Sequence, residues 1–101
     1  MIREMPAHTT AVVVILDGDT EAGRQLARRK LADGHRVVVV ARHAADVVEV
    51  MHGHSADRVM VIAADVSDPR QWSRLTARVT ARFGQIDGVV RADGAVLRSS
   101  A

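Results

Sequence analysis

The chain has 101 residues, of which 48% are hydrophobic, and this composition predicts one globular domain at most and argues against wholesale disorder. It contains no cysteine, which excludes disulfides and thiolate metal sites and suits a reducing cytoplasm. The net charge is only +2, and one Trp and one Phe are the only aromatic residues, so we expect no nucleic-acid partner.

The first part of the chain predicts a strand, a helix and a second strand. Residues 11–16 form a continuous apolar run, which is typical of a strand covered on both faces and is too short for a membrane span. The Asp-Gly-Asp-Thr sequence at 17–20 is a turn and helix-start signal. Residues 21–33 carry apolar residues at helical spacing, and Gly34 is placed to end this helix. Residues 36–41, with four valines in a row, are the second predicted strand.

The second part continues the alternation of helices and strands. Residues 44–51 predict a short helix and residues 59–63 a third strand. Ser67-Asp68-Pro69 is a helix-start signal, with Asp as the cap and Pro in the first turn. Residues 86–90 predict a fourth strand, and residues 91–101 a trailing loop. The helix after Pro69 has one apolar face and ends at Gly84; the face is made of Trp72, Leu75, Val79 and Phe83.

These elements predict an α/β fold, a half Rossmann-like parallel sheet of order 3-2-1-4 formed by β-α-β-α-β-α-β. We expect a flexible N-terminal segment at 1–10, the half-domain at 11–94 and a C-terminal tail at 95–101. The first two helices should lie on one face of the sheet and the third on the other. The fourth strand would be an unprotected edge, so we expect a homo-oligomer or a partner chain that completes the sheet, in the cytoplasm and without membrane contact.

Several segments, in one order along the chain, resemble the short-chain dehydrogenase/reductase (SDR) family. They are Gly23-Arg-Gln-Leu-Ala27 in the first helix, residues 37–42 at the second strand, Ala64-Asp65-Val66-Ser67-Asp68 after the third strand, residues 83–90 running into the fourth, and Gly94-Ala95-Val96-Leu97 after it. The resemblance covers nearly the whole chain from residue 11. It implies a Rossmann-type cofactor site and the chemistry of an NAD(P)-dependent oxidoreductase.

The phosphate loop of that family, Thr-Gly-x-x-x-Gly-x-Gly, is altered here. Aligned back from Gly23 without gaps, Leu16 and Asp17 replace the Thr-Gly pair, and Glu21 replaces the middle glycine. The family needs glycines there so that backbone N–H groups can approach the pyrophosphate at the helix N-terminus. Each of the acids Asp17, Asp19 and Glu21 would repel a phosphate about 5 Å away by about 1–3 kcal/mol. The interpretation that we favour is that these acids cap the helix and complement its dipole.

The catalytic motifs of the family are missing from this sequence. The chain contains no Tyr, so the Tyr-x-x-x-Lys acid/base pair that the resemblance implies cannot exist within it. The single lysine, Lys30, falls on the first predicted helix. The Asn-Asn-Ala-Gly motif of the family becomes Arg91-Ala92-Asp93-Gly94. We therefore name no catalytic residue.

Two positions still suit a cofactor. Arg42 follows the second strand, where the family places a positive side chain against the 2′-phosphate of NADP. Asp65 follows the third strand, where the family contacts the adenine. The alternatives are a solvated loop arginine and a helix-entry aspartate. The candidate cofactor-binding residues are Gly18, Gly23, Arg42, Asp65, Val66 and Gly94, and the expected cofactor is NADP, bound weakly or not at all.

Three other patterns could indicate a site, and for each we favour a simpler explanation. Asp17 and Asp19 resemble the Asp-x-Asp loop of haloacid-dehalogenase-type phosphatases, which use Mg²⁺, but the later motifs of that family are not evident. His52 and His54 make at most an incomplete set of metal ligands, so we assign no metal site. Four arginines recur at intervals of four residues and could bind phosphate, although a solvent-exposed helix face explains them; they are Arg70, Arg74, Arg78 and Arg82.

The sequence thus predicts a truncated, degenerate SDR-like protein, a pseudoenzyme without oxidoreductase activity on its own and with at most weak NADP(H) binding. The alternative from another class is an oligomerising interaction or scaffold module that binds no nucleotide. A third possibility is one piece of a split enzyme whose catalytic residues lie on another chain.

Overall fold

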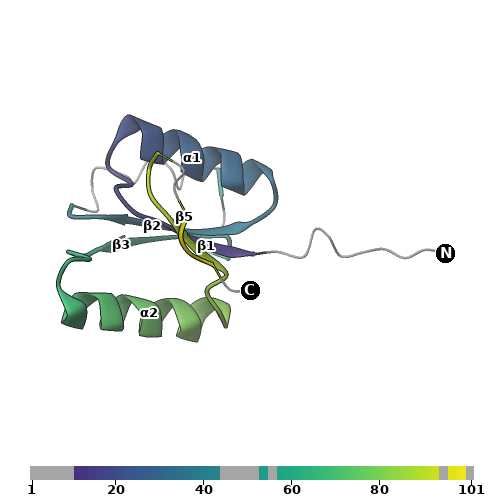
Figure 1. The fold of residues 1–101 in the computed structure, drawn as a ribbon. Coiled ribbons are helices and arrows are strands. Elements are labelled where there is room, and N and C mark those ends of the chain that lie inside the picture. The colour runs from purple at the N-terminus through teal and green to yellow at the C-terminus, as the bar shows by residue number, and fades with distance from the viewer. Residues whose placement is uncertain (1–10, 44–52, 55–56, 94–95, 100–101) are drawn as a thin grey trace.

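Two helices lie on opposite faces of a five-stranded sheet (Figure 1). The computed structural model describes residues 11–43, 53–54, 57–93 and 96–99. In chain order, the elements are β1 (Val12–Ile15), α1 (Glu21–Ala32), β2 (Arg36–Ala41), β3 (Val59–Ala63), α2 (Pro69–Phe83), β4 (Gly88–Val90) and β5 (Val96–Ser99).

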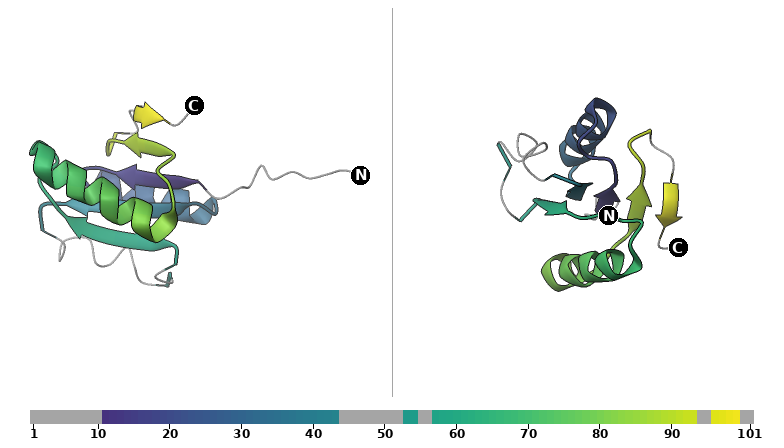
Figure 2. Two further views of the ribbon diagram at one scale, coloured as in Figure 1. Left: turned by 90° about the horizontal axis from the view of Figure 1, so that it is seen from below. Right: turned by 90° about the vertical axis from the view of Figure 1, so that its left-hand side faces the viewer.

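The sheet has the order β3-β2-β1-β4-β5, and its first four strands pair in parallel. This confirms the predicted α/β class and the 3-2-1-4 order. The first and last predicted helices, α1 and α2, lie on opposite faces as expected (Figure 2). The helix predicted at 44–51 lies outside the described residues. Because these four strands are parallel, their carboxyl ends meet at one edge of the sheet.

The valine runs are explained by a core on each face of the sheet. In β1, Val13 and Ile15 belong to the cluster packed against α1, whereas Val12 and Val14 belong to the cluster packed against α2. A central parallel strand has no solvent face, so every position in it favours an apolar residue. Full burial of each such side chain contributes about 1.5–3 kcal/mol to folding. The helices add Leu26, Ala27 and Leu31 from α1 and Leu75, Val79 and Phe83 from α2.

The first helix begins at a threonine cap rather than at an acidic one. Thr20 has extended backbone angles, and its hydroxyl oxygen accepts a hydrogen bond from the Gly23 N–H at 3.0 Å. The expectation that Asp17, Asp19 and Glu21 cap α1 is therefore wrong for the cap itself. Glu21 alone of the three lies in the first turn, where its charge complements the helix dipole. Thr20 is the residue at which the backbone changes from extended to helical, so its side-chain oxygen, and not that of an acid, reaches the first-turn N–H of Gly23.

The second helix begins and ends as predicted. The Asp68 carboxylate accepts from the Arg70 N–H at 2.9 Å, and Pro69 is the first helical residue. Gly84 ends the helix with a φ of 90°, a left-handed conformation that glycine adopts without steric cost. Within the described ranges, neither helix is long and apolar enough to cross a membrane.

A fifth strand follows β4, where the sequence predicted a loop at 91–101. β5 pairs antiparallel with β4, with an irregularity between Val89 and Val90 (Figure 2). The expectation that β4 is the bare edge of the sheet is therefore wrong, because β5 takes its open hydrogen-bonding groups. Val96 and Leu97 are 64% and 51% exposed, so no apolar burial pattern marked this strand in advance. β5 forms because its backbone pairs with that of β4, and the residues of β5 alone do not indicate this pairing.

Two polar side chains connect the strand ends in a way that sequence patterns did not indicate. The Asp87 carboxylate accepts from the Val12 N–H at 2.7 Å, which ties the start of β1 to the segment before β4. The Arg58 guanidinium donates to the carbonyl oxygens of Leu31 and His35 at 2.7 and 3.1 Å. These contacts occupy backbone groups at the amino-terminal edge of the sheet, opposite the edge where the candidate site lies.

Candidate functional site

A hollow of about 190 Å³ lies at the carboxyl ends of β1, β2 and β3. Its walls come from the residues that follow each strand, among them Asp17 and Asp19 after β1, Arg42 after β2, and Asp65 and Val66 after β3. A neighbouring hollow of about 230 Å³ shares the Arg42 and Asp65 walls. In open parallel sheets, ligands bind in the crevice at these strand ends, so the topology alone makes this the leading site.

Two predicted site residues, Gly18 and Gly23, are packed against the protein itself. The Gly18 N–H donates to the Val40 carbonyl oxygen at 2.8 Å, and a Cβ there would lie 2.1 Å from a methyl group of Val39. A Cβ at Gly23 would lie 2.3 Å from the carbonyl oxygen of Asp17. Neither glycine is among the residues that line the hollow. Both are therefore explained by close packing of the β1 loop against β2 and α1.

Asp17 carries the backbone conformation of a glycine. Its φ of 56° is the only positive value among the non-glycine residues that the structure describes. The Thr20 hydroxyl and N–H donate to the Asp17 carbonyl oxygen at 2.8 and 3.1 Å, which holds the turn in this shape. Aspartate tolerates the left-handed region better than most residues. At the position of the first glycine of the SDR pattern, this chain therefore has an acid in a backbone conformation that favours glycine.

Glu21, which replaces the middle glycine of the SDR pattern, is held along the side of α1. Its carboxylate accepts from Arg24 at 2.9 Å and from Gln25 at 3.1 Å. The hydrogen bond from Arg24, and then the one from Gln25, lower the pKa of Glu21 below its usual value of 4.5. Arg24 also donates to the Asp19 carbonyl oxygen at 3.0 Å. Glu21 is therefore ionised at neutral pH, and Arg24 partly offsets its charge.

Asp65 serves as both a turn residue and a wall of the hollow. Its Oδ1 accepts from the Ser67 hydroxyl at 2.6 Å and from the Ser67 N–H at 3.0 Å. The hydroxyl bond, and then the backbone bond, lower the pKa of Asp65 below 3.8, with a smaller contribution from the charge of Arg42. The carboxylate is therefore ionised at neutral pH. The helix-entry role and the ligand-facing position proposed for Asp65 are compatible in this geometry.

Sequence reasoning missed two supporting residues behind Asp65. The side-chain Oε1 of Gln71 accepts from the Asp65 N–H at 2.8 Å, and the side-chain Nε2 of Gln71 donates to the Asp68 carboxylate at 3.3 Å. Together with Ser67, Gln71 fixes the loop between β3 and α2. The spacing Asp65-x-Ser67 is typical of a side-chain turn, and Asp68-x-x-Gln71 is typical of a helix cap, so both signals were present in the sequence.

Of the remaining predicted site residues, three line the same hollow and one lies outside the described residues. Arg42, Asp65 and Val66 come together at the hollow. Arg42 is exposed and reaches the walls of both hollows. Val66 is half-buried and packs against the α2 side of the core. Gly94 lies outside the described residues.

No metal centre is evident in the described ranges, where no group of three or more His, Asp or Glu side chains is placed to hold an ion. Asp17 and Asp19, the pair that resembles a phosphatase loop, line the same hollow as Arg42. His54 is half-buried in a bend, and His52 lies outside the described residues.

The chain matches the family model described as short chain dehydrogenase over residues 11–100. It is 33% identical over 78 residues to a cis-2,3-dihydrobiphenyl-2,3-diol dehydrogenase from Paraburkholderia xenovorans (strain LB400), covering 77% of this chain and 28% of the relative. Among solved structures, a short-chain dehydrogenase from Streptomyces avermitilis superposes with a TM-score of 0.73 at 27% identity, covering 81% of this chain and 30% of that one.

A 3-ketoacyl-(acyl-carrier-protein) reductase from Brucella melitensis, solved in complex with NADH, superposes with a TM-score of 0.72 at 25% identity. The superposition covers 79% of this chain and 32% of the reductase. The chain therefore spans about a third or less of the length of these relatives. Family match, sequence identity and strand order agree, and the chain belongs to the short-chain dehydrogenase family.

Proposed function

We propose that this chain forms the cofactor-binding half of a short-chain dehydrogenase, that it holds the adenosine end of NADP(H) weakly, and that it transfers no hydride by itself. The observation that carries the proposal is the hollow at the carboxyl ends of β1–β3, where Arg42, Asp65 and Val66 converge. The family binds nicotinamide dinucleotides, and the Brucella relative is complexed with NADH.

The adenosine end of the cofactor fits the residues on the β2 and β3 side of the hollow. The Arg42 guanidinium is exposed at the rim, where it can pair with a 2′-phosphate through two parallel hydrogen bonds. Asp65 uses Oδ1 within its own turn and presents a second carboxylate oxygen as an acceptor for an adenine amino group. Val66 offers an apolar surface to the flat face of the base.

The pyrophosphate fits less well, because the β1 side of the same hollow is acidic. Asp17 and Asp19 line it, and Glu21 lies in the first turn of α1. A carboxylate about 5 Å from a phosphate costs about 1–3 kcal/mol at intermediate dielectric, which is a loss of affinity of about fivefold to about a hundredfold for each. The proposed affinity for NADP(H) is weak for this reason.

A bound nicotinamide would supply hydride transfer. This chain lacks the acid/base side chain that would exchange a proton with the substrate oxygen. It contains no Tyr, and its single lysine, Lys30, is half-buried near the end of α1. A proton donor for a substrate oxygen would have to come from outside these 101 residues.

A direct titration of the purified chain with NADP⁺, followed by isothermal calorimetry, tests the proposal. We expect saturable binding in the high micromolar to millimolar range and a loss of about tenfold in Arg42→Ala, the size of one charge-assisted contact. NAD⁺ should bind equally to both forms, because it lacks the 2′-phosphate. Arg29→Ala on the exposed side of α1 is the matched control and should change neither affinity. No heat change at millimolar NADP⁺ with a folded chain would overturn the proposal.

The outer strand β5 supports a second candidate, an interaction module that associates with a second copy or a partner chain. Val96 and Leu97 are the exposed large hydrophobic residues of the described part, and they lie together on the outermost strand. Exposed strand edges with apolar side chains favour association. Light scattering over a range of concentrations should show a dimer that Val96→Lys with Leu97→Lys dissociates. A monomer at every concentration would remove this candidate and leave cofactor binding untouched.

A further inference from the structure

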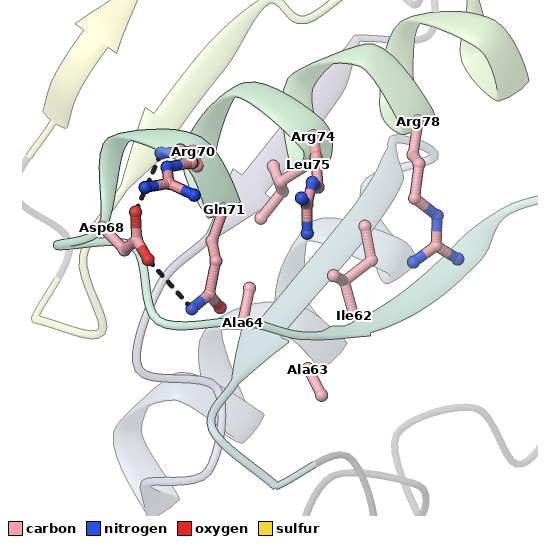
Figure 3. A pocket seen from close by; sticks show the side chains of 9 residues that line it. All are labelled: Ile62, Ala63, Ala64, Asp68, Arg70, Gln71, Arg74, Leu75 and Arg78. Atoms are coloured by element: carbon pink, nitrogen blue, oxygen red, sulfur yellow. Dashed lines mark hydrogen bonds between the residues drawn. The ribbon is translucent and has the colours of Figure 1, made fainter.

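A third hollow, of about 300 Å³, lies between α2 and the strand β3 (Figure 3). Ile62 and Leu75 lie beneath it, and the side chains of Arg70, Arg74 and Arg78 surround it from the α2 side. We call this feature the arginine groove. Its volume is at the lower end of the range for small-molecule sites, which is about 300–1,000 Å³.

The groove carries a net positive charge. Arg70, Arg74 and Arg78 are exposed, and in the part of the chain that the structure describes no carboxylate forms a salt bridge with any of them. The carboxylate of Asp68, which also lines the groove, is engaged as the helix cap by the Arg70 N–H and the Gln71 amide. The lining therefore holds three guanidinium groups and one carboxylate.

The fourth arginine of the same series behaves differently and lies outside the groove. Arg82 pairs with Asp57 at 3.9 Å. The other three continue along the groove at intervals of four residues, which is about 6 Å of helix rise for each step. A solvent-exposed helix face explains the spacing but not the gathering of three unpaired guanidinium groups around one hollow. The sequence pattern alone could not show that Arg82 differs from the other three arginines in this way.

We propose that the arginine groove binds a short polyphosphate, such as inorganic triphosphate or the phosphate chain of a nucleoside triphosphate. Guanidinium groups match phosphate oxygens with paired, charge-assisted hydrogen bonds, and long arginine side chains from successive helix turns can converge on one phosphate chain. The groove adjoins the hollows at the strand ends: it shares Ala64 with the first of them, and Ala63, Ala64 and Gln71 with its neighbour. Arg42 lines the candidate cofactor site and not the groove, so the two sites can be separated by mutation.

Calorimetric titration with inorganic triphosphate at low ionic strength tests this proposal. We expect saturable one-to-one binding and a loss of at least about tenfold in the double variant Arg74→Ala/Arg78→Ala. The matched control Arg28→Ala/Arg29→Ala removes the same charge from α1 and should retain the affinity. Alanine is a good helix former, so circular dichroism should show both variants folded. An equal loss in the control, or no saturable binding of the unaltered chain, would overturn the proposal.

Three further arms identify the ligand and keep the two sites apart. If ATP binds with the same affinity as triphosphate, the groove is a site for a phosphate chain. If ATP binds more tightly than triphosphate, and this binding is lost in the same double variant, the groove is a nucleotide site. A single-stranded oligonucleotide or a poly-glutamate peptide that binds while triphosphate does not would overturn it in favour of a macromolecular partner. Arg42→Ala should weaken NADP⁺ and leave triphosphate unchanged, so that failure of one proposal is distinguishable from failure of the other.

Discussion

The loops after β1 and β3 open on the same hollow and each begins a helix, yet they differ in what their residues contact. In the β3 loop, Asp65 and Ser67 both line the hollow, and Ser67 and Gln71 hold the carboxylate and the N–H of Asp65. In the β1 loop, Gly18 and Gly23 are turned against β2 and the loop's own backbone, and acids face the hollow. The β3 loop therefore presents to the hollow a carboxylate that neighbouring side chains hold in place, whereas the two glycines of the β1 loop only pack against the protein.

This contrast separates two demands that a phosphate loop makes on its glycines. One demand is internal, because Cβ atoms at Gly18 and Gly23 would collide with protein atoms. The other is external, because a phosphate must come close to the backbone. Asp17 and Glu21 replace glycines at positions where the chain tolerates a side chain. The β1 loop therefore keeps the close packing at Gly18 and Gly23 but adds negatively charged side chains at the hollow.

The largest expected effect is loss of stability in Gly23→Ala. The added Cβ would lie 2.3 Å from the Asp17 carbonyl oxygen, which is backbone and cannot rotate away. We expect a loss of about 2–3 kcal/mol in the free energy of unfolding, measured by urea denaturation. Ala27→Gly, one turn further along α1, is a reference for a change of similar size without a collision. A Gly23→Ala chain as stable as the unaltered one would contradict the packing role of this glycine.

A smaller effect is expected at the two helix caps, and it should be similar in both loops. Thr20→Ala removes the acceptor for the Gly23 N–H, and Asp68→Ala removes the acceptor for the Arg70 N–H. Each should lower the free energy of unfolding by about 1 kcal/mol. Thr20→Ser and Asp68→Asn keep a capping oxygen and should recover most of the loss. A negligible change in either alanine variant would show that its loop does not depend on the cap.

The smallest expected effect is the pH dependence of Glu21. Its pKa is lowered in the folded chain, so its contribution to stability is present above about pH 4.5 and is lost as the pH falls through the folded value. Glu21 is exposed, so the contribution is small. The stability difference between the unaltered chain and Glu21→Gln should therefore shrink from pH 7 to pH 3 in thermal unfolding scans. A difference that grows on acidification would contradict the contacts from Arg24 and Gln25.

The fold could be predicted where one local signal determined each element. The valine runs, the Asp68-Pro69 helix start and the stop at Gly84 need no partner to be recognised, and the parallel order follows from the alternation of elements. β5 could not be predicted, because Val96 and Leu97 stay exposed and pair only through the backbone of β4. The cap at Thr20 was missed because four residues with a side-chain oxygen lie within five positions of the chain, namely Asp17, Asp19, Thr20 and Glu21.

The candidate site was only partly predictable for a related reason. Residues that follow parallel strands must meet at one edge, so Arg42, Asp65 and Val66 could be grouped from the sequence. Whether a glycine faces a ligand or the core depends on the neighbouring strand. Only the structure places a methyl group of Val39 beside Gly18 and the Asp17 carbonyl beside Gly23. The loss of two motif glycines, at positions 17 and 21, could be seen in the sequence, but the close packing that explains Gly18 and Gly23 could not.

The most direct test of the acidic β1 loop is an NADP⁺ titration of the double variant Asp17→Gly/Glu21→Gly. Glycine suits the φ of 56° at position 17, so the loop should keep its shape. Removal of two carboxylates should tighten binding by at least about tenfold, and Arg42→Ala in the same background should reverse much of the gain. A folded double variant that binds NADP⁺ no better than the unaltered chain would contradict the account.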